Sequence, residues 1–293
     1  MTFVQRALSF SFQLGTGSFG GSGSNTVTPP AGLWANVHIV KNGVPSMNRA
    51  EISIYGMQLS VMNQLSRIGL LPTAVRNNIV TVMAGEAGGN MALAFSGGIK
   101  ECWPDFSSPT EAVLRVSAFT GLLAQMKPVA PLSFSGPTDV ATVMGQLAQQ
   151  MGFTLQNNGV SVQVRDPYLP GTARAQALAL ADAAGIYVVF DDDNGIMAIL
   201  PKTGSRSGTA PTISPTEDMS GYPTYVGPGQ IGLRCEYNNQ LRFLGNVIVQ
   251  NSQVTGANGA WRVTGLEHDL STRPDGPWFS TVRGNNLYSA PNA

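Results

Sequence analysis

Hydrophobic and polar residues alternate over short stretches in the first hundred residues of the chain. In Ala7–Leu14 the alternation places Leu8, Phe10 and Phe12 on one face. Arg49–Tyr55 repeats the pattern, with its alanine and both isoleucines on one face. A period of two residues is typical of a strand with one buried and one exposed face. Both segments are therefore predicted to be half-buried β-strands.

One helix and several further strands are predicted before residue 120. Met57–Gly69 carries apolar residues three or four positions apart and ends at a glycine, which predicts a helix. Lys41–Gly43 contains Asn-Gly, the strongest short hairpin signal, and predicts a tight turn between two strands. The other predicted strands of this segment are Leu33–Val40, Asn78–Ala84, Met91–Lys100 and Glu111–Phe119.

Helices and strands are mixed in the middle of the chain. Val140–Met151 has helical spacing, with Thr138 predicted as its N-cap and Gly152 as its end. Thr172–Ala184 predicts a second helix because alanine has the highest helix propensity. The strands predicted around these helices are Phe153–Gln156, Ser161–Arg165, Ile186–Phe190 and Ile196–Leu200. The last two flank an acidic turn and predict a hairpin, so the segment is interpreted as a small α+β unit with an internal pseudo-repeat.

Two linker-like stretches separate this unit from its flanks. The Lys-Pro-Val-Ala-Pro sequence at 127–131 predicts a stiff linker, because each proline fixes φ, and residues 203–214 also have linker composition. The strands predicted after the second linker are Gly229–Tyr237, Phe243–Asn251, Gly259–Asp269 and Trp278–Arg283. Their regular spacing indicates an antiparallel barrel or sandwich.

The predicted fold is mainly β with an α+β insertion. Two similar β-barrel domains, at residues 1–128 and 204–293, are expected to flank a small helix-strand domain at residues 129–203. The chain of 293 residues is long enough for such a division.

Composition excludes several classes of function. Lys and Arg number 17, as do Asp and Glu, so the formal net charge is zero, and only 12% of the residues are charged. A chain without excess basic residues offers no phosphate-neutralising surface, which argues against nucleic-acid binding. No continuous apolar run is long enough to predict a transmembrane helix. The first residues also lack the apolar core of a signal peptide.

No metal or cofactor site is predicted. Cys102 and Cys235 lack the spacing of zinc ligands or of a disulfide framework and are interpreted as buried thiols. Gly15–Gly20 matches GxGxxG, but the Gly/Ser-rich stretch after it cannot begin the helix that would hold a phosphate. Asp191–Asn194 lacks the glycine and glutamate that a calcium loop requires at its sixth and twelfth positions. We interpret it as an acidic turn.

No catalytic residues are predicted either. His38 and His268 are the only two histidines. His268 stands between Glu267 and Asp269, but adjacent strand residues point to opposite faces, so it shares a face with neither carboxylate. The chain contains no GxSxG or HExxH motif. We therefore expect a protein that is not an enzyme.

The tryptophans leave two interpretations open. Core packing is the first, and an exposed subset that anchors an interface is the second. The four residues are Trp34, Trp103, Trp261 and Trp278.

The ordered set of segments along the chain resembles the hub proteins of bacteriophage tail baseplates. This family includes the T4-type central hub and the tail late-control proteins of Mu- and P2-like phages. The segments that carry the resemblance in the first two thirds are Arg49–Met57, Met91–Lys100, Val140–Phe153, Asp166–Leu169 and Ala175–Gly185. Stronger ones follow at Gly221–Pro223, Gly232–Tyr237, Gly245–Ser252, Asn258–Arg273 and Pro277–Gly284. Leu241–Gly245 departs from the family's usual turn, and the short chain is expected to lack a spike of its own.

The resemblance implies a structural protein of the virion, assembled in the cytoplasm of the bacterial host. Hubs of this family form homotrimers in which each subunit contributes two similar β-barrels, so that a three-fold spike meets a six-fold tail tube. The implied partners are a tail tube or tube-adaptor protein and the central spike, with tape-measure and wedge proteins as further candidates. DNA would pass through the lumen of the ring without specific binding.

Two alternatives remain open from the sequence. One is the hub of a phage-derived secretion or bacteriocin device, which would share the fold. The other is a tail-associated module that binds or degrades polysaccharide. The sequence does not decide between a contractile and a non-contractile tail, and it does not identify the host, the spike or the lumen-facing residues.

Overall fold

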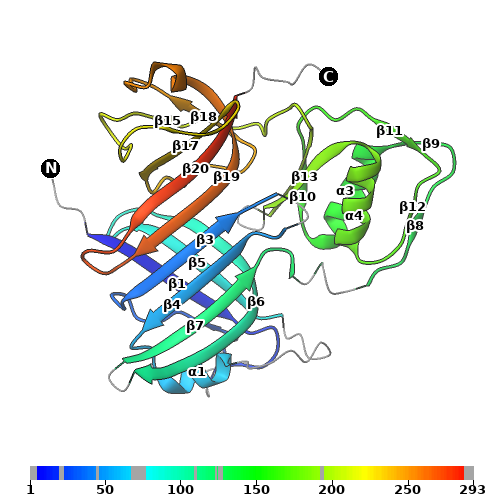
Figure 1. Ribbon diagram of the computed structural model, residues 1–293. Helices are drawn as coiled ribbons and strands as arrows, with labels where there is room; N and C mark the ends of the chain where they lie inside the picture. Colours follow the sequence, from blue (N-terminus) through cyan, green and yellow to red (C-terminus); the bar gives the residue numbers. More distant parts are fainter. Residues whose placement is uncertain are drawn as a thin grey trace. The chain divides into compact units, whose positions relative to one another are not determined.

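The computed structural model of the chain describes residues 5–19, 23–43, 46–66, 77–108, 111–122, 124, 128–191 and 195–286. The chain forms two compact units. Unit 1 comprises residues 1–40, 48–122 and 268–278, and unit 2 comprises residues 41–47, 123–267 and 279–293. Strands dominate both units, so the prediction of a mainly β fold is confirmed (Figure 1).

Unit 1 is an antiparallel sheet with one short helix. Its strands are β1 (Arg6–Gln13), β2 (Thr26–Val27), β3 (Ala35–Lys41), β4 (Arg49–Tyr55), β5 (Ile79–Glu86), β6 (Met91–Ser108) and β7 (Glu111–Phe119), with helix α1 at Leu59–Leu65. They pair in the order β3-β4-β7-β6-β5-β1-β2, and the end of strand β19 (Gly259–Ser271) pairs with the free side of β3. The sheet therefore depends on a strand more than 200 residues away in the sequence.

The alternation predicted for the first strands is confirmed. Leu8, Phe10 and Phe12 are all buried, as are the alanine and both isoleucines of β4. Among the described residues, helix α1 covers only Leu59–Leu65 and is shorter than predicted. Leu59 is exposed rather than packed in the core. Residues 67–69 of that prediction lie outside the described residues.

Two local predictions, for the connection after β3 and for strand β6, need correction. Lys41 is the last residue of β3, and its antiparallel partner β4 begins only at Arg49, so the connection is longer than the predicted tight turn. A Cβ on Gly43 would lie 2.8 Å from the Phe243 ring, so this glycine serves close packing rather than a two-residue turn. Strand β6 also continues past Lys100 to Ser108, because a bulge near Ile99 shifts the alternation that the sequence shows.

The insertion within unit 2 contains helices α3 and α4 and most of the short strands that the structure describes. Its elements are β8 (Leu132–Ser133), β9 (Pro137–Asp139), α3 (Val140–Met151), β10 (Thr154–Asn157), β11 (Gln163–Arg165), β12 (Tyr168–Leu169), α4 (Ala173–Ala183), β13 (Ile186–Asp191) and β14 (Ile196–Pro201). Figure 1 shows α3 and α4 side by side next to the β10-β14-β13 sheet. Both predicted helices and the predicted β13–β14 hairpin are confirmed to within one residue at most of their boundaries.

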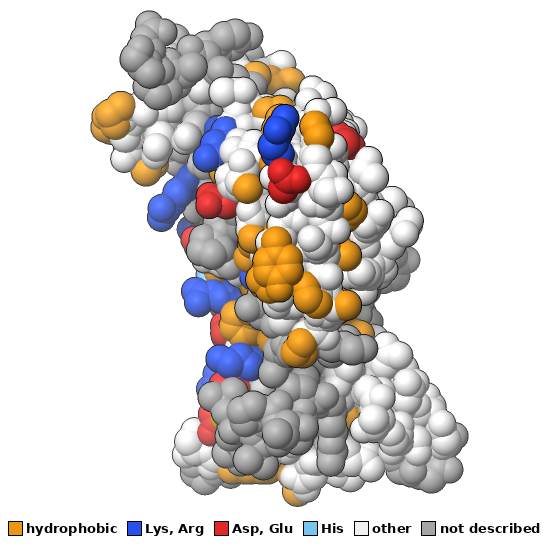
Figure 2. All heavy atoms as spheres, turned by 90° about the vertical axis from the view of Figure 1, so that its right-hand side faces the viewer, with side chains coloured by type: hydrophobic (Ala, Val, Ile, Leu, Met, Phe, Trp, Pro, Cys, Tyr) orange, Lys and Arg blue, Asp and Glu red, His pale blue; other side chains and the backbone are white. Residues whose placement is uncertain are grey.

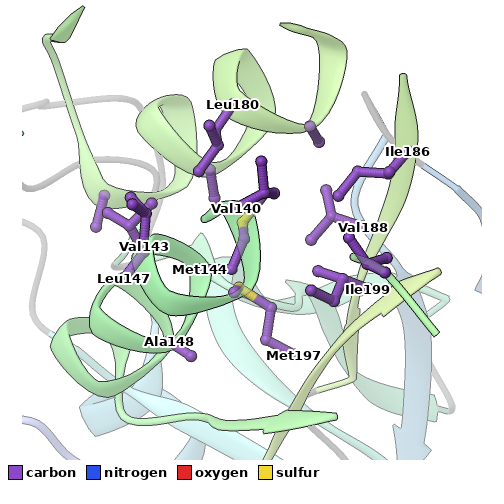
Figure 3. Close-up of a cluster of buried hydrophobic side chains, with 14 of the residues drawn as sticks. Val140, Val143, Met144, Leu147, Ala148, Leu180, Ile186, Val188, Met197 and Ile199 are labelled. Atoms are coloured by element: carbon purple, nitrogen blue, oxygen red, sulfur yellow. The ribbon is translucent and has the colours of Figure 1, made fainter. Parts of the chain in front are cut away.

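The insertion has a core of its own. Figure 3 shows Val140, Met144 and Leu147 of α3 facing Leu180 of α4, with side chains of β13 and β14 closing the cluster. All four named side chains are fully buried. A continuous cluster of this kind is what an independently packed layer of helix on sheet requires.

Two predictions inside the insertion need correction. Asp139 rather than Thr138 caps α3, because its carboxylate accepts hydrogen bonds at 2.8 Å from both the backbone N and the Oγ1 of Thr142. Thr138 belongs to β9. The strands predicted around residues 153–165 do not pair with each other: β10 runs parallel to β14, and β11 pairs with β9. The first half of the predicted pseudo-repeat therefore lacks the hairpin of the second half.

The rest of unit 2 contains the remaining strands of the same 13-stranded sheet, which are antiparallel except for the parallel pair of β15 with β18. Its elements are β15 (Thr212–Ile213), β16 (Thr224–Gly227), β17 (Gln230–Glu236), β18 (Asn246–Val249), the 3₁₀ turn η2 (Thr255–Ala257), β19 and β20 (Trp278–Asn286). The order is β16-β17-β20-β19, with β18 also on β19 and β15 on β18. Along the described pairings this sheet does not close into a barrel, so the two-barrel part of the predicted fold is not confirmed.

The chain passes repeatedly between the two units. Strand β19 belongs to unit 2 up to Glu267 and to unit 1 from His268, and β20 returns to unit 2 after Trp278. The predicted division into three domains assigns β19 and β20 entirely to the last domain, residues 204–293. It stays a prediction.

Candidate interaction surface

A cluster of aromatic and charged side chains lies at one end of the unit 1 sheet. Trp34 directly precedes β3 and Tyr55 is the last residue of β4, and the backbone N of Tyr55 donates to the carbonyl of Trp34 at 2.9 Å. The next residue, Gly56, donates to the carbonyl of Ala112 at the start of β7, at 3.2 Å. Regular strand pairing therefore fixes both aromatic residues at the same end of the sheet.

Arg273 completes this cluster from the loop between β19 and β20. Its guanidinium carbon lies 4.5 Å from the ring centre of Tyr55 and 5.1 Å from that of Trp34, distances at which cation–π attraction operates. Its Nη2 lies 3.8 Å from Oε2 of Glu111. Thr272 anchors the loop, since its Oγ1 accepts from the backbone N of Ala35 and donates to the carbonyl of Leu33.

The cluster borders an open cavity of about 340 Å³. The lining residues are Gly32, Leu33, Trp34, Tyr55, Gly56, Glu111 and Ala112. Gly32 and Gly56 have φ values of +86° and +73°, a backbone conformation that favours glycine, and the absence of a side chain at each keeps the space open. Trp34 remains 51% exposed, so its indole is available at the surface.

The chemistry of the cavity favours recognition over catalysis. Hydrolysis of a glycoside generally needs two carboxylates that face one bond. Glu111 is the only carboxylate in the lining, and it already faces the Arg273 guanidinium. Tryptophan, tyrosine and arginine, which meet here, are the residue types that contribute most binding energy at protein interfaces.

Three acidic side chains of unit 1 that are not buried have hydrogen-bonding partners. His38 Nδ1 lies 2.7 Å from Oδ1 of Asp269, and Ser117 donates to Glu51 at 3.1 Å. Arg115 donates to Asp105 at 3.2 Å, and the backbone N of Ser107, together with this arginine, lowers the pKa of the Asp105 carboxyl. In Figure 2, which shows one face of the molecule, basic and acidic side chains are interspersed rather than gathered into a patch of one sign.

The structure agrees with the interpretation of His268 and adds a contact that the sequence did not predict. His268 is buried, whereas Glu267 and Asp269 on either side are partly exposed, as the alternation along β19 requires. The pairing of Asp269 with His38, 231 residues away, has no local signal in the sequence.

Residues of the glycine-rich match and of the acidic run make contacts within the protein. The backbone N of Gly15 donates to Oδ1 of Asn78, and Phe19 is buried, with no helix described after it. Asp191 forms a buried ion pair with Arg206 at 2.9 Å, and residues 192–194 lie outside the described residues. No group of three or more potential metal ligands occurs within the part of the chain that the structure describes.

The cysteines and tryptophans occupy the expected environments only in part. Burial raises the pKa of both Cys102 and Cys235 to about 12, so both thiols stay protonated near neutral pH. Trp261 and Trp278 are buried in the core, whereas Trp34 is the exposed member that the second interpretation anticipated. None of the helices on the described residues is both long and apolar enough to cross a membrane.

Comparison with known proteins decides the family. The profile of the baseplate hub gp41 family matches residues 16–284. The chain belongs to this baseplate hub family. It is accordingly a structural hub of a phage tail, and its place is the baseplate of the virion.

Solved structures show that the fold is shared with other phage tail proteins. The 43 kDa tail protein of prophage MuSo2 from Shewanella oneidensis has a TM-score of 0.62 at 9% identity, over 97% of both chains. A tail protein from Neisseria meningitidis MC58 has a TM-score of 0.61 at 11% identity, over 95% of this chain and 96% of that one. No curated protein sequence matches the chain.

The fold also occurs in a secretion machine. The Escherichia coli c3393 protein, a component of the type VI secretion system with structural similarity to the T4 tail proteins gp27 and gp5, has a TM-score of 0.59. It is 12% identical over 94% of this chain and 76% of its own.

Proposed function

We propose that three copies of this hub form a ring that joins the tail tube to the central spike and encloses part of the DNA ejection channel. The match to the baseplate hub family over residues 16–284 is the observation that carries the proposal. The division of the chain into two compact units, both rich in strands, supports it, because three such chains provide six units, the number needed to meet a six-fold tube. Barrel-like similarity between the flanking β segments is part of this proposal.

The charge distribution is consistent with a channel through which DNA passes. The formal net charge of the chain is zero, and Asp269, Asp105 and Glu51 of unit 1 have basic or hydroxyl partners. A chain without an excess of Lys and Arg neutralises few phosphates. DNA would therefore pass without being held.

A structural role without enzymatic activity is part of the same proposal. The only carboxylate of the described cavity faces an arginine, and both cysteines are buried. Purified hub is expected to release no product from peptidoglycan or receptor glycans in a dye-release assay. Activity that a single Asp or Glu substitution abolishes would overturn this part.

Native mass measurement of the hub mixed with its spike tests the ring. The expected complex contains three hub chains, each of 30.8 kDa. Tail tube or tube-adaptor protein should then bind to the same complex. A stable hexamer of the hub, or no complex with either partner, would contradict the proposal.

A phage-derived secretion device is the second candidate, because the fold is shared with a type VI secretion component. The neighbouring genes distinguish the two. Capsid and terminase genes beside the hub gene would indicate a phage, whereas their absence next to secretion genes would indicate the device.

A further inference from the structure

We infer that residues 202–207, the anchor segment, hold the insertion rigidly on strands β18 and β19 of unit 2. Most of this segment belongs to the stretch 203–214, whose composition predicts a flexible linker. Instead, hydrogen bonds join the anchor segment to the insertion on one side and to the β18–β19 region on the other. All of these contacts lie within one chain and within unit 2, so the inference does not depend on the proposed ring.

The sheet of the insertion is buried on both faces. Val188 of β13 and Ile199 of β14 belong to the core that the sheet shares with α3 and α4. The opposite face of the same two strands forms a second buried cluster with the turn that precedes β18. The members of this cluster are Val189, Ala198, Leu200, Phe243 and Leu244. A sheet with two covered faces is an inner layer of a packed structure and not the free surface of an appendage.

Arg206 is the centre of the anchor segment. Its side chain is only 2% exposed, and its Nη2 donates to Oδ2 of Asp191 at the end of β13, at 2.9 Å. The same Nη2 donates to Oε1 of Gln156 in β10, at 3.4 Å. Its backbone N donates to the carbonyl of Leu244 at 2.7 Å. One residue therefore binds two strands of the insertion through its side chain and the turn before β18 through its backbone.

Other residues of the anchor segment add bonds in both directions. The backbone N of Ser207 donates to Oδ1 of Asn158, directly after β10, at 2.8 Å. From the opposite side, Nη1 of Arg262 in β19 donates to the carbonyls of Lys202 and Gly204, at 2.8 and 2.9 Å. These bonds offset the entropy that a segment rich in glycine and serine loses when it is ordered.

The turn that receives the Arg206 bond has a strained backbone. Leu244 has a φ of +58°, which is rare for a bulky residue and persists only where the surrounding contacts hold it. Its side chain is buried in the second cluster, and its backbone N donates to the carbonyl of Val263 in β19 at 2.8 Å. The contact between the insertion and β19 is therefore fixed from both partners.

The anchor segment has a mechanical consequence. Coupling between distant sites is carried by packed side chains and hydrogen-bond networks. A partner that binds the insertion therefore acts on β18 and β19 as on one rigid body. A flexible linker would not transmit such a displacement.

The distance between two spin labels on the full-length hub tests this rigidity. Gln149→Cys in α3 and Gln250→Cys after β18 place the labels at exposed positions, and the two native cysteines are buried. Mixing with excess unlabelled hub removes distances between copies. Double electron–electron resonance should show one narrow distance distribution in this background, because the anchor segment fixes the insertion.

Arg206→Ala should broaden this distribution, and the exchange of the amides of residues 206 and 207 should become about tenfold faster or more. Gln156→Ala should act in the same direction to a smaller extent, and it decides the test if Arg206→Ala does not fold, because it leaves no buried charge without its partner. Arg165→Ala is the matched control: this arginine is exposed on β11, so neither measurement should change. Protection of the α3 amides checks that the insertion itself stays folded.

Three results would overturn the inference. One is a broad distribution in the labelled hub before any change to the anchor segment. Another is a distribution that stays narrow in every folded variant among Arg206→Ala and Gln156→Ala. The third is an effect of Arg165→Ala as large as that of Arg206→Ala, since loss of any arginine would then explain the change.

Discussion

The insertion and the unit 1 sheet are held together in different ways. The insertion takes its core from one run of the chain, between Val140 and Ile199. Unit 1 completes its sheet only when β19 pairs with β3, and the hydrogen bond between Ala35 and Thr272 joins residues 237 positions apart. Ordering the loop between such distant partners costs entropy before the contact contributes. The fold of the insertion should therefore depend on its own residues, whereas the sheet of unit 1 should depend on residues from distant parts of the chain.

The largest effects should come from the two cores. Phe12 and Leu180 are both fully buried, in unit 1 and in the insertion respectively. Phe12→Ala should lower the free energy of unfolding by about 3–5 kcal/mol, and Leu180→Ala by about 2–5 kcal/mol, through lost burial and the cavity left behind. Denaturant unfolding measures both.

Hydrogen exchange shows whether the two regions respond separately. Phe12→Ala should speed exchange of the unit 1 amides while α3 and α4 keep their protection. Leu180→Ala should do the reverse. If either variant reduced protection equally in both regions, the insertion and the unit 1 sheet would not be stabilised separately.

The buried ion pair between Asp191 and Arg206 should have the next largest effect. The two side chains are only 9% and 2% exposed, and the pair joins the end of β13 to the segment after the insertion. Asp191→Ala should destabilise unit 2 by about 3–5 kcal/mol, because it leaves a buried guanidinium without its counter-charge.

The control for this prediction replaces both partners. Asp191→Leu combined with Arg206→Met removes the charges and keeps apolar volume, so its cost in thermal unfolding should be much smaller than that of Asp191→Ala. An equal loss in both variants would indicate that packing, and not the unpaired charge, dominates.

The local specification of the insertion can be tested at the start of α3. Asp139→Ala should cost about 0.5–2 kcal/mol, because the N-cap hydrogen bonds to Thr142 are lost. Thr138→Ala is the matched control and should cost less, since its hydroxyl reaches only the carbonyl of Gly136, at 3.3 Å. A larger effect at Thr138 would contradict the assigned cap.

This cap also predicts a pH dependence. The side-chain and backbone hydrogen bonds of Thr142 lower the pKa of the Asp139 carboxyl below its ordinary value. A carboxyl with a lowered folded-state pKa stabilises fully above its unfolded-state pKa, near 3.9, and loses that contribution as the pH falls through the folded-state value. The difference in stability between wild type and Asp139→Ala should therefore shrink below about pH 4. A constant difference from pH 2 to pH 7 would rule out this role for the ionised cap.

The smallest effect should come from the His38–Asp269 contact. Both side chains are 38% exposed, so Asp269→Asn should change the stability of unit 1 by only about 0.2–1 kcal/mol. The difference should shrink further as salt is added. If Asp269→Asn lowered the stability more than Asp139→Ala does, the pairing of β19 with β3 would depend on the His38–Asp269 contact more than the exposure of its two side chains suggests.

Much of the insertion could be predicted because its signals are local. The alanine-rich run, Gly152 and Gly185 specify the helices from neighbouring residues alone, and both glycines have positive φ, as helix ends favour. Asp139 and Thr138 could not be separated as caps, since both residue types suit that position. The parallel pairing of β10 with β14 could not be predicted either, because strand partners are set by packing and not by alternation.

The candidate surface could not be predicted from any one stretch of sequence. Trp34, Tyr55, Glu111 and Arg273 come from four separate segments and meet only through strand pairing. The sequence allowed some of the four tryptophans to be exposed at an interface, but it did not indicate that Trp34 would be the exposed one. The same holds for His38 and Asp269, which no motif connects. The second half of strand β6 was not predicted, because the bulge near Ile99 interrupts the alternation of hydrophobic and polar residues.

The passage of β19 and β20 through both units limits how related hub genes can exchange their parts. A recombinant that takes residues 1–128 from one phage and the remainder from another would receive β3 and its partner strand from different parents. Its Ala35 and Asn36 would then meet unfamiliar residues where Thr272 and Ser271 now accept and donate their hydrogen bonds. A mismatch would expose the edge of β3 to aggregation. Exchanges confined to the insertion leave this pairing intact, so diversity among such hubs should accumulate there first.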